Sequence, residues 1–416
     1  MHLPQLQQHT PSLWSIASRK LACNRPLTAR SGSLVAHCAF ASSAFGNSSS
    51  PVKPIVVMGR YTNMMLGGHR GMGENLTTVK TDGKLGVYPA FRENTIQSFQ
   101  QAAKCGVGFV EFDVQVTRDN VPVIWHDDDV VTGPADHPSK PQIKDLTLAE
   151  LQTLCGSSGR YQPGGSHEGR GSGSDSGGSS SGGDPPGGEL MRLFRDRVTR
   201  QWGSGYLPWR CDQDDAIPTL EAVFASMPPE IGFDIEIKMT TGDDVVHTPS
   251  QEVDRMLGAI LPVVHRCSSL PSSSSSFPSA FTSSSPAAPL PPPPLTPQSA
   301  ARRRRIIFSS FDPDVCVELR RRQEEHPVYY LSGCGLYAHA DARRTSIPAA
   351  LSFAAETGMR GIVVPASVLL RNMDMVVSAS RSQLELMTYG LENNDLDSLR
   401  AQADAGVVAA IVDEVA

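Results

Sequence analysis

Short apolar runs, rich in β-branched residues, alternate along the chain with stretches in which apolar residues recur at helical spacing. Eight runs have the length and composition of strands, and they cover residues 56–69, 109–116, 233–238, 306–311, 328–332, 361–364, 384–390 and 409–412. Strands that alternate with helices pair in parallel, because a parallel connection needs a crossover long enough to hold a helix. The pattern therefore predicts an α/β protein with a parallel sheet.

Helical periodicity fills segments between the runs, for example at residues 94–105, 313–325, 347–357 and 394–405. Asn94 or Thr95 has the short polar side chain that caps a helix N-terminus. Gly106 suits the left-handed turn that ends a helix.

A ninth strand-like run, residues 121–126, follows its predecessor after only four residues. A parallel crossover needs about a dozen residues or more, so this run must be the antiparallel arm of a hairpin. The other eight runs match a TIM-type (β/α)8 barrel. The chain ends directly after the eighth run, so we expect the last outer helix to be absent or reduced.

Two low-complexity stretches interrupt this rhythm, at residues 156–188 (Gly, Ser, Pro and charged residues) and 268–304 (Ser runs, then Pro runs). Neither can bury enough apolar surface to offset the entropy of ordering, so both are predicted to be long disordered insertions in one barrel domain, residues 55–416. The arginines at 302–305 are interpreted as the solvated edge of the second insertion.

The N-terminal segment has the composition of a targeting sequence. It is basic and rich in Ser and Ala, and the first acidic residue of the chain is Glu74. Such acid-poor composition is typical of transit peptides. We therefore predict a disordered transit peptide at residues 1–54 and a location in the chloroplast, with the mitochondrion as the alternative.

Composition excludes several classes of protein. A net charge of −6 gives no reason to expect nucleic acid as a partner, and no apolar run approaches the length of a transmembrane segment. The 8 cysteines include no CxxC pair, which argues against a zinc ribbon and favours scattered free thiols. Nothing in the pattern predicts an oligomeric state.

Acidic side chains occupy one face of two predicted strands. Glu111 and Asp113 alternate with apolar residues in the second run, and Asp234, Glu236 and Lys238 alternate with apolar residues in the third. A half-exposed strand with a polar solvent face would give the same pattern. In a parallel barrel, however, both faces of a strand are covered, and a divalent cation such as Mg²⁺ or Ca²⁺ would relieve the repulsion between buried carboxylates.

Two histidines lie at the ends of predicted strands, where the functional groups of barrels gather. His69 stands beside Arg70 in a glycine-rich loop, and His126 ends the hairpin arm. A single histidine is usually structural, but two of them beside a carboxylate set favour an acid/base site.

The motifs HRG (69–71), ENT (93–95), EFDVQVTRDNVPVIWHD (111–127), DIEIK (234–238) and IIFSSFDPD (306–314) resemble those of the glycerophosphodiester phosphodiesterases, in their plant and algal, plastid-type branch. These enzymes belong to the phospholipase C-like phosphodiesterase superfamily. The resemblance runs from about residue 68 to 412. It implies a TIM-type barrel with a small hairpin insertion, in agreement with the strand count.

The resemblance also implies a role for each matching residue: catalytic His69 and His126; metal ligands Glu111, Asp113 and Glu236; and a substrate-binding set of Arg70, Lys238 and Glu93. The role of Glu93 is open between metal-proximal and structural. Two departures from the family pattern affect the expected shape of the substrate pocket. Arg92 stands where the bacterial pattern has Pro, and residues 71–90 make a long gap before Glu93.

The implied reaction is the metal-dependent hydrolysis of a glycerophosphodiester to sn-glycerol 3-phosphate and an alcohol, in lipid and phosphate metabolism. Three carboxylates and a divalent cation sum to −1, and Arg70 and Lys238 bring the site to +1, which suits a phosphodiester anion. Two imidazoles can supply the base and the acid, and we favour His69 as base and His126 as acid. The nucleophile is either water or the neighbouring glycerol hydroxyl.

Two other functions are compatible with the same residues. A lysophospholipase D-type enzyme would share the site and add an apolar rim at the barrel mouth. A non-catalytic barrel could serve as a binding module, although such a protein would not need both histidines and all three carboxylates.

Overall fold

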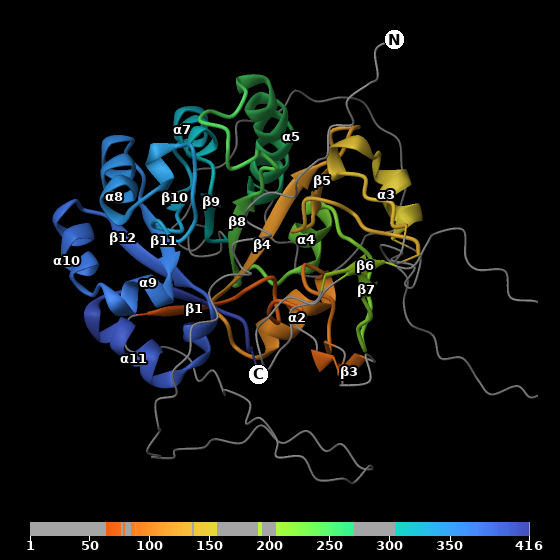
Figure 1. Ribbon diagram of the computed structural model, residues 1–416, viewed down its shortest axis with the longest axis horizontal. Coiled ribbons are helices and arrows are strands. Elements are labelled where there is room, and N and C mark those ends of the chain that lie inside the picture. Colours follow the sequence, from red (N-terminus) through yellow and green to blue (C-terminus); the bar gives the residue numbers. More distant parts are fainter. Residues whose placement is uncertain are drawn as a thin grey trace, which may run out of the picture.

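The computed structural model describes residues 64–75, 78–79, 85–87, 89–134, 137–155, 190–193, 205–269 and 304–415 (Figure 1). The predicted transit peptide, the first predicted insertion and nearly all of the second lie outside these residues.

Eight parallel strands close into a barrel, which confirms the predicted fold (Figure 1). They are β1 (Met65–Gly68), β4 (Phe109–Val116), β8 (Gly232–Ile237), β9 (Ile306–Ser310), β10 (Val328–Leu331), β11 (Gly361–Pro365), β12 (Glu385–Tyr389) and β13 (Ala409–Val412). Neighbours follow chain order, and β1 closes the barrel by pairing with both β13 and β4. Of the first predicted run, 56–69, residues 65–68 form β1, and residues 56–63 lie outside the described residues.

The ninth strand of this sheet, β5 (Pro122–Ile124), runs antiparallel to β4, as the short connection required. Two further two-stranded sheets were not predicted. One joins β2 (Thr78–Val79) to β3 (Leu85–Val87), and the other joins β6 (Met191–Arg192) to β7 (Leu207–Pro208). Their strands are too short to leave a periodic signal in the sequence.

Helices surround the strands (Figure 1). The described ones are α2 (Ile96–Lys104), α3 (Leu148–Leu154), α4 (Leu220–Ser226), α5 (Ser250–Ser269), α7 (Pro313–Arg322), α8 (Ile347–Glu356), α9 (Ala366–Arg371), α10 (Asp374–Arg381) and α11 (Leu396–Ala405), with single 3₁₀ turns η1 (Ile143–Asp145), η2 (Ala342–Arg344) and η3 (Leu391–Asn394). Thr95, one of the two residues considered, caps α2 by accepting a hydrogen bond from Ser98 N. None of the described helices has the length and apolar content that a membrane span requires.

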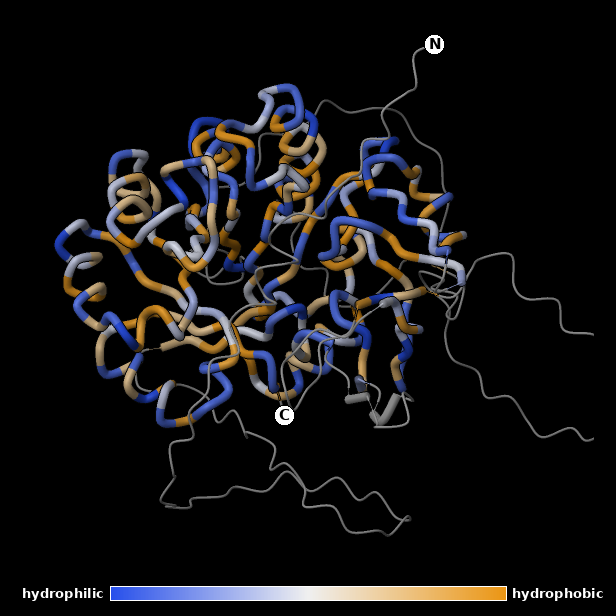
Figure 2. Tube along the Cα trace, viewed as in Figure 1, coloured by the Kyte–Doolittle hydropathy of each residue, from blue (hydrophilic) through white to orange (hydrophobic). Residues whose placement is uncertain are grey.

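Side chains alternate between two apolar layers along the strands. On β4, Val110, Phe112 and Val114 belong to the large cluster between strands and helices, whereas Phe109 belongs to a second cluster inside the barrel. That inner cluster adds Tyr329, Leu331, Val363, Met387, Ala409 and Ile411 from four further strands. The barrel strands are largely hydrophobic (orange) in Figure 2. The inward positions that follow Phe109 on β4 are Glu111 and Asp113, so the barrel interior changes from apolar to acidic along the strand.

The edges of the second predicted insertion differ from the prediction. Helix α5 continues to Ser269, inside the range 268–304. Arg304 was interpreted as part of a solvated edge, and this was wrong: its guanidinium donates hydrogen bonds to the carbonyl oxygens of Met227, Pro228 and Ile231. It also stacks on the Phe233 ring at 4.0 Å. Arg304 thus fixes the start of β9 to the carbonyl groups that follow α4.

Candidate active site

The loop after β1 carries His69 and Arg70 to the carboxyl end of the barrel. The His69 N–H donates to Val412 O at 3.0 Å, so the loop is tied to the end of β13. Gly73 has a φ of +112°, and a Cβ there would lie 1.7 Å from the carbonyl oxygen of Asp413. Only glycine permits this close approach, which explains part of the glycine-rich loop.

Three buried carboxylates meet at the same end of the barrel. Glu111 and Asp113 extend from β4 and Glu236 from β8, and the strand register sets Asp113 opposite Glu236. One oxygen of each carboxylate lies within 4.8 Å of the others, and we call the three residues the acidic cluster. The sequence pattern placed these side chains on one face of each strand, and the barrel brings the two faces together.

The acidic cluster is electrostatically crowded. Burial and the neighbouring Asp113 raise the pKa of Glu111 well above its usual value. Burial also raises the pKa of Glu236 to about 7, although the ammonium of Lys238 opposes this shift. Removal from water and like charges both disfavour ionisation, so the three carboxylates need positive charge to be ionised together.

Asp113 is the member of the cluster that remains ionised most easily. Burial favours its neutral form, but the charges of His126, Arg70 and Lys238 outweigh burial and lower its pKa to about 2. Its Oδ2 accepts a hydrogen bond from Asn94 Nδ2 at 2.9 Å. Its Oδ1 is buried and accepts no hydrogen bond from any residue that the structure describes.

Arg70 is fixed beside the cluster. Its backbone N–H donates to Glu111 Oε2 at 3.0 Å, and its Nη1 donates to Glu93 Oε1 at 2.7 Å. Its Nε lies 3.5 Å from Asp113 Oδ2. The residue has a φ of +50°, in the left-handed region that non-glycine residues rarely occupy, and such strain often accompanies functional sites.

Lys238 lies next to the cluster. Its Nζ is 3.6 Å from Glu236 Oε1 and 3.8 Å from Asp113 Oδ1. Burial lowers the pKa of Lys238, but the two carboxylates outweigh burial and raise it overall, so the ammonium stays charged.

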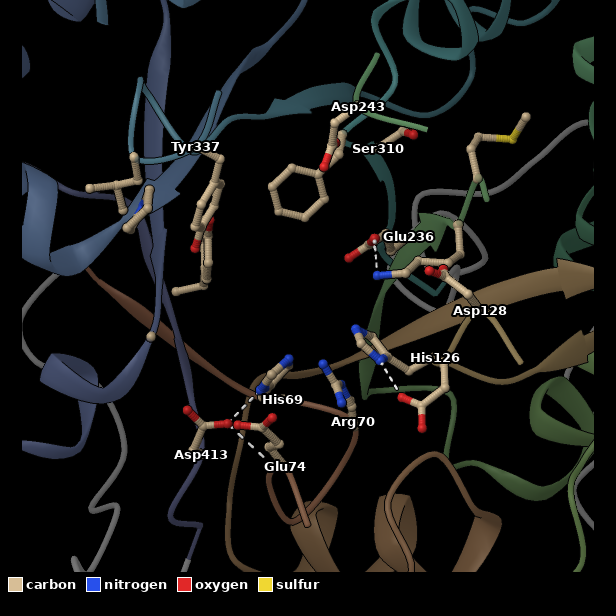
Figure 3. A pocket seen from close by; sticks show the side chains of 18 of the residues that line it. His69, Arg70, Glu74, His126, Asp128, Glu236, Asp243, Ser310, Tyr337 and Asp413 are labelled. Carbon is tan, nitrogen blue, oxygen red and sulfur yellow. Dashed lines mark hydrogen bonds and ion pairs between the residues drawn. The ribbon is translucent and has the colours of Figure 1, made fainter. Parts of the chain in front are cut away.

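Each histidine has a carboxylate at its Nδ1 atom (Figure 3). The Nδ1 of His69 contacts Asp413 Oδ1, and the Nδ1 of His126 lies 2.9 Å from Asp127 Oδ1. A carboxylate accepts the hydrogen of Nδ1 and so leaves Nε2 as the atom that exchanges protons.

The surroundings of the two imidazoles differ in charge. Burial lowers the pKa of His69, but Asp413 outweighs burial and raises it to about 9. Burial lowers the pKa of His126 well below its usual value, and the charges of Arg70 and Lys238 act in the same direction. The two histidines are therefore differently poised for proton transfer.

A cavity of about 520 Å³ joins these groups. His69, Arg70, His126, Glu236 and Lys238 line it. In Figure 3, Arg70 lies between the two imidazoles, and Tyr337 and Asp243 lie across the cavity from them. A volume of this size suits a small molecule.

Glu93 lies behind Arg70 and does not line the cavity. It accepts hydrogen bonds from Arg70 Nη1, from Asn75 N and from Arg192 Nη2. Of the two roles left open for Glu93, this position supports the structural one.

Sequence reasoning did not assign Asn94, Asp127, Arg192 or Asp413 to the site. Asn94 and Asp127 lie within the quoted motifs, directly beside Glu93 and His126, and this adjacency was a usable signal. Asp413 directly follows the eighth strand, where a barrel places functional groups. Arg192 lies at the end of a two-residue strand, and no local pattern marks it.

Comparisons with known proteins give one consistent result. Residues 69–291 and 292–416 match the model of the Glycerophosphoryl diester phosphodiesterase family. The chain is 30% identical over 349 residues to the chloroplastic glycerophosphodiester phosphodiesterase GDPD1 of Arabidopsis thaliana, which covers 84% of this chain and 77% of that protein. It is also 30% identical to the glycerophosphocholine phosphodiesterase GDE1 of Eremothecium gossypii, over 84% of this chain and 25% of that longer protein.

Among solved structures, a putative glycerophosphoryl diester phosphodiesterase from Silicibacter pomeroyi is similar, with 18% sequence identity and a TM-score of 0.49. The similarity covers 86% of this chain and 92% of that one.

Proposed function

Because the chain belongs to the glycerophosphoryl diester phosphodiesterase family, and is thus an enzyme that hydrolyses glycerophosphodiesters, we propose that His69 and His126 transfer the protons of this reaction beside a divalent cation. The products are sn-glycerol 3-phosphate and an alcohol. One observation carries the proposal: both imidazoles line one cavity together with Glu236 of the acidic cluster, at the carboxyl end of the barrel.

The acidic cluster fits a divalent cation. Its three residues are buried, their oxygens lie within 4.8 Å of one another, and Asp113 Oδ1 accepts no hydrogen bond within the described part of the chain. All donors are carboxylate oxygens, which suit Mg²⁺ or Ca²⁺. When bound, such a cation supplies Lewis-acid stabilisation of charge on the phosphoryl group.

Arg70 and Lys238 would bind the phosphodiester anion. Both line the cavity and both are charged at neutral pH. The Arg70 guanidinium is already oriented by Glu93, and Glu111 holds the Arg70 backbone N–H, so little side-chain entropy is lost on binding. A guanidinium offers two parallel donors to phosphate oxygens, and an ammonium adds a point charge.

The two histidines would remove a proton from the nucleophile and donate one to the leaving alkoxide through their Nε2 atoms. We assign His69 as the base and His126 as the acid, the order that the sequence favoured. Without a cation the pKa shifts favour the opposite order, because they protonate His69 and leave His126 neutral. A cation held by Glu111, which lies 3.9 Å from His69 Nε2, would lower the pKa of His69. A substrate with a nitrophenol leaving group separates these roles, because nitrophenolate departs without a proton. The His126→Ala variant should then recover most of its activity on this substrate, and the His69→Ala variant should not. The opposite result would reverse the assignment.

The direct test of the site is His126→Ala assayed by release of sn-glycerol 3-phosphate. We expect a loss of about 10²–10⁴-fold in kcat, the range for removal of a general acid or base. His247→Ala is the matched control, because this histidine has a side chain 71% exposed and does not line the cavity. Turnover near the wild-type level in His126→Ala would remove His126 from the mechanism.

Removal of metal is the second test of the site. EDTA should abolish activity, and Mg²⁺ or Ca²⁺ should restore it. Full activity in chelator would contradict the assignment of the acidic cluster as a cation site.

The lysophospholipase D-type activity stays an alternative. Acidic groups such as Glu74 and Glu392 line the cavity, but so do apolar side chains such as Phe311 and Leu336. The exposed Val245 and Val246 lie in the loop after β8, beside Asp243, which lines the cavity. Activity on lysophospholipid micelles would select this alternative. Family membership shows an enzyme, so we do not retain the non-catalytic binding module as an alternative.

We also propose a location in the plastid. The support is the acid-poor composition of residues 1–54 and the chloroplastic name of the GDPD1 relative. A fusion of residues 1–60 to a fluorescent protein should label chloroplasts in plant or algal cells. Labelling of mitochondria would select the alternative, and diffuse fluorescence would contradict both.

A further inference from the structure

Arg192 reaches the active site from outside the barrel strands. It lies on β6, which pairs with β7 so that Arg192 is opposite Leu207, and Met191 N donates to Val131 O at 2.8 Å. These backbone contacts hold the segment between β7 and the chain that follows His126. The Arg192 side chain is only 8% exposed.

The guanidinium of Arg192 joins two buried or half-buried carboxylates. Nη2 donates to Glu93 Oε1 at 2.9 Å and to Asp127 Oδ1 at 2.8 Å, and Nη1 lies 2.9 Å from Glu93 Oε2. The two terminal nitrogens of the planar group thus lie within 2.9 Å of carboxylate oxygens of both residues, a fixed geometry that an ammonium does not reproduce.

Each of these carboxylates holds a group of the proposed site. Glu93 accepts from Arg70 Nη1 at 2.7 Å, and Asp127 lies 2.9 Å from His126 Nδ1. The contacts form a network around Arg192, with one arm through Glu93 to Arg70 and the other through Asp127 to His126. We propose that Arg192 is a positioning residue that sets Arg70 for phosphate binding and His126 for proton transfer.

Electrostatics agree with this geometry. Burial raises the pKa of Glu93, but the charges of Arg192 and Arg70 outweigh burial and hold it well below its usual range. Without Arg192, Glu93 and Asp127 would lose their shared counter-ion. The side chains of Arg70 and His126 would then be held less firmly. The inference rests on the proposed function, since it assumes the roles of Arg70 and His126.

Arg92 provides a matched control. It is a second buried arginine on the same aromatic ring: its guanidinium lies 4.6 Å from the Trp209 ring, and that of Arg192 lies 4.3 Å from it. The sequence connected Arg92 with the pocket, but its side chain donates to Asp214 and to Trp209 O and does not line the cavity. Replacing Arg92 therefore removes a similar stack and ion pair without touching Glu93 or Asp127 through its side chain.

The experiment compares Arg192→Met, Arg192→Lys and Arg92→Met in the full chain with Mg²⁺, by steady-state kinetics and thermal unfolding. We expect Arg192→Met to lower kcat and raise KM, with a loss in kcat/KM of about 10–100-fold, as for other residues that orient functional side chains. Arg192→Lys should recover only part of the loss, because it keeps the charge but not the fork. Arg92→Met should lower the melting temperature comparably and leave kcat and KM near wild type.

Second substitutions separate the two arms. Asp127→Asn should lower mainly kcat and Glu93→Gln should raise mainly KM. If Arg192 acts through Asp127, Arg192→Met should reduce kcat little further in the Asp127→Asn background. Fully additive effects in both backgrounds would mean that Arg192 contacts the substrate itself, and this would overturn the positioning role. Wild-type kinetics in Arg192→Met, or equal losses in Arg92→Met, would also overturn it.

The outcomes also separate this inference from the proposed function. An inactive wild-type enzyme with Mg²⁺ or Ca²⁺ would refute the function. An active wild type with an unaffected Arg192→Met variant would refute only the inference.

Discussion

At the scale of single residues, each histidine of the site is paired with a carboxylate. His69 faces Asp413 and His126 faces Asp127, in each case through Nδ1. A carboxylate in this position fixes the tautomer and the orientation of the ring. The two pairs differ in their separation along the chain. Asp127 directly follows His126, whereas Asp413 is 344 positions away from His69.

Asp413→Asn should impair catalysis while leaving the fold intact. An amide can hold the imidazole in the wrong tautomer, and the loss of charge also destabilises the protonated ring. We expect kcat to fall about 10–100-fold or more, in the range for partners that orient functional groups. The measurement is release of sn-glycerol 3-phosphate, with Asp404→Asn, an exposed position on α11, as control. An unchanged kcat would show that the Asp413 contact is dispensable.

At the scale of elements, the segment at the start of α2 supports residues of the active site. The N-terminus of α2 places Glu93 and Asn94 just before its cap at Thr95, where Glu93 accepts from Arg70 and Asn94 donates to Asp113. Asn94 has a φ of +58°, which an asparagine tolerates better than most residues. The start of one helix thus supports both Arg70 and Asp113.

Arg304→Ala should destabilise the junction between α4 and β9. The guanidinium donates to three carbonyl oxygens past the end of α4 and stacks on Phe233. Leaving those acceptors unsatisfied should lower the free energy of unfolding by about 1–3 kcal/mol. Arg305→Ala is the matched control, since the adjacent Arg305 is exposed. Denaturant unfolding measures both variants, and equal stability of the two would contradict the capping role.

At the scale of the whole molecule, the barrel interior is divided along its axis. Apolar side chains such as Phe109, Tyr329 and Ile411 fill one part, and the acidic cluster lies toward the carboxyl ends of β4 and β8. The apolar part stabilises the fold and the acidic part destabilises it, because like charges are held together away from water.

A divalent cation should therefore stabilise the folded protein measurably. Binding to the native state alone at about 100 times the dissociation constant adds about 2.7 kcal/mol. We expect millimolar Mg²⁺ or Ca²⁺ to raise the melting temperature of the wild type and to have no such effect on Glu236→Gln. Glu324→Gln, on the surface, should respond like the wild type. Equal shifts in wild type and Glu236→Gln would exclude the cluster as the binding site.

The barrel could be predicted because its signals are local. β-branched runs, helical periodicity and the four-residue link before β5 each depend on neighbouring residues, and together they required eight parallel strands and a hairpin. The same locality put Glu111 with Asp113 and Asp234 with Glu236 on common faces, since alternation along a strand is a property of the backbone. Helix ends were less well predicted, and α7 stops at Arg322 rather than at residue 325.

The sequence by itself thus determined the order of the elements, the acidic faces and the two histidines. Only the tertiary structure decided which distant groups meet: Asp413 with His69, Arg192 with Glu93 and Asp127, and Arg304 with the carbonyl groups after α4. Closure of the barrel brings β13 next to β1, and a two-residue strand pairing brings in Arg192. Such contacts depend on packing between segments far apart in the chain, and no period or local propensity encodes them.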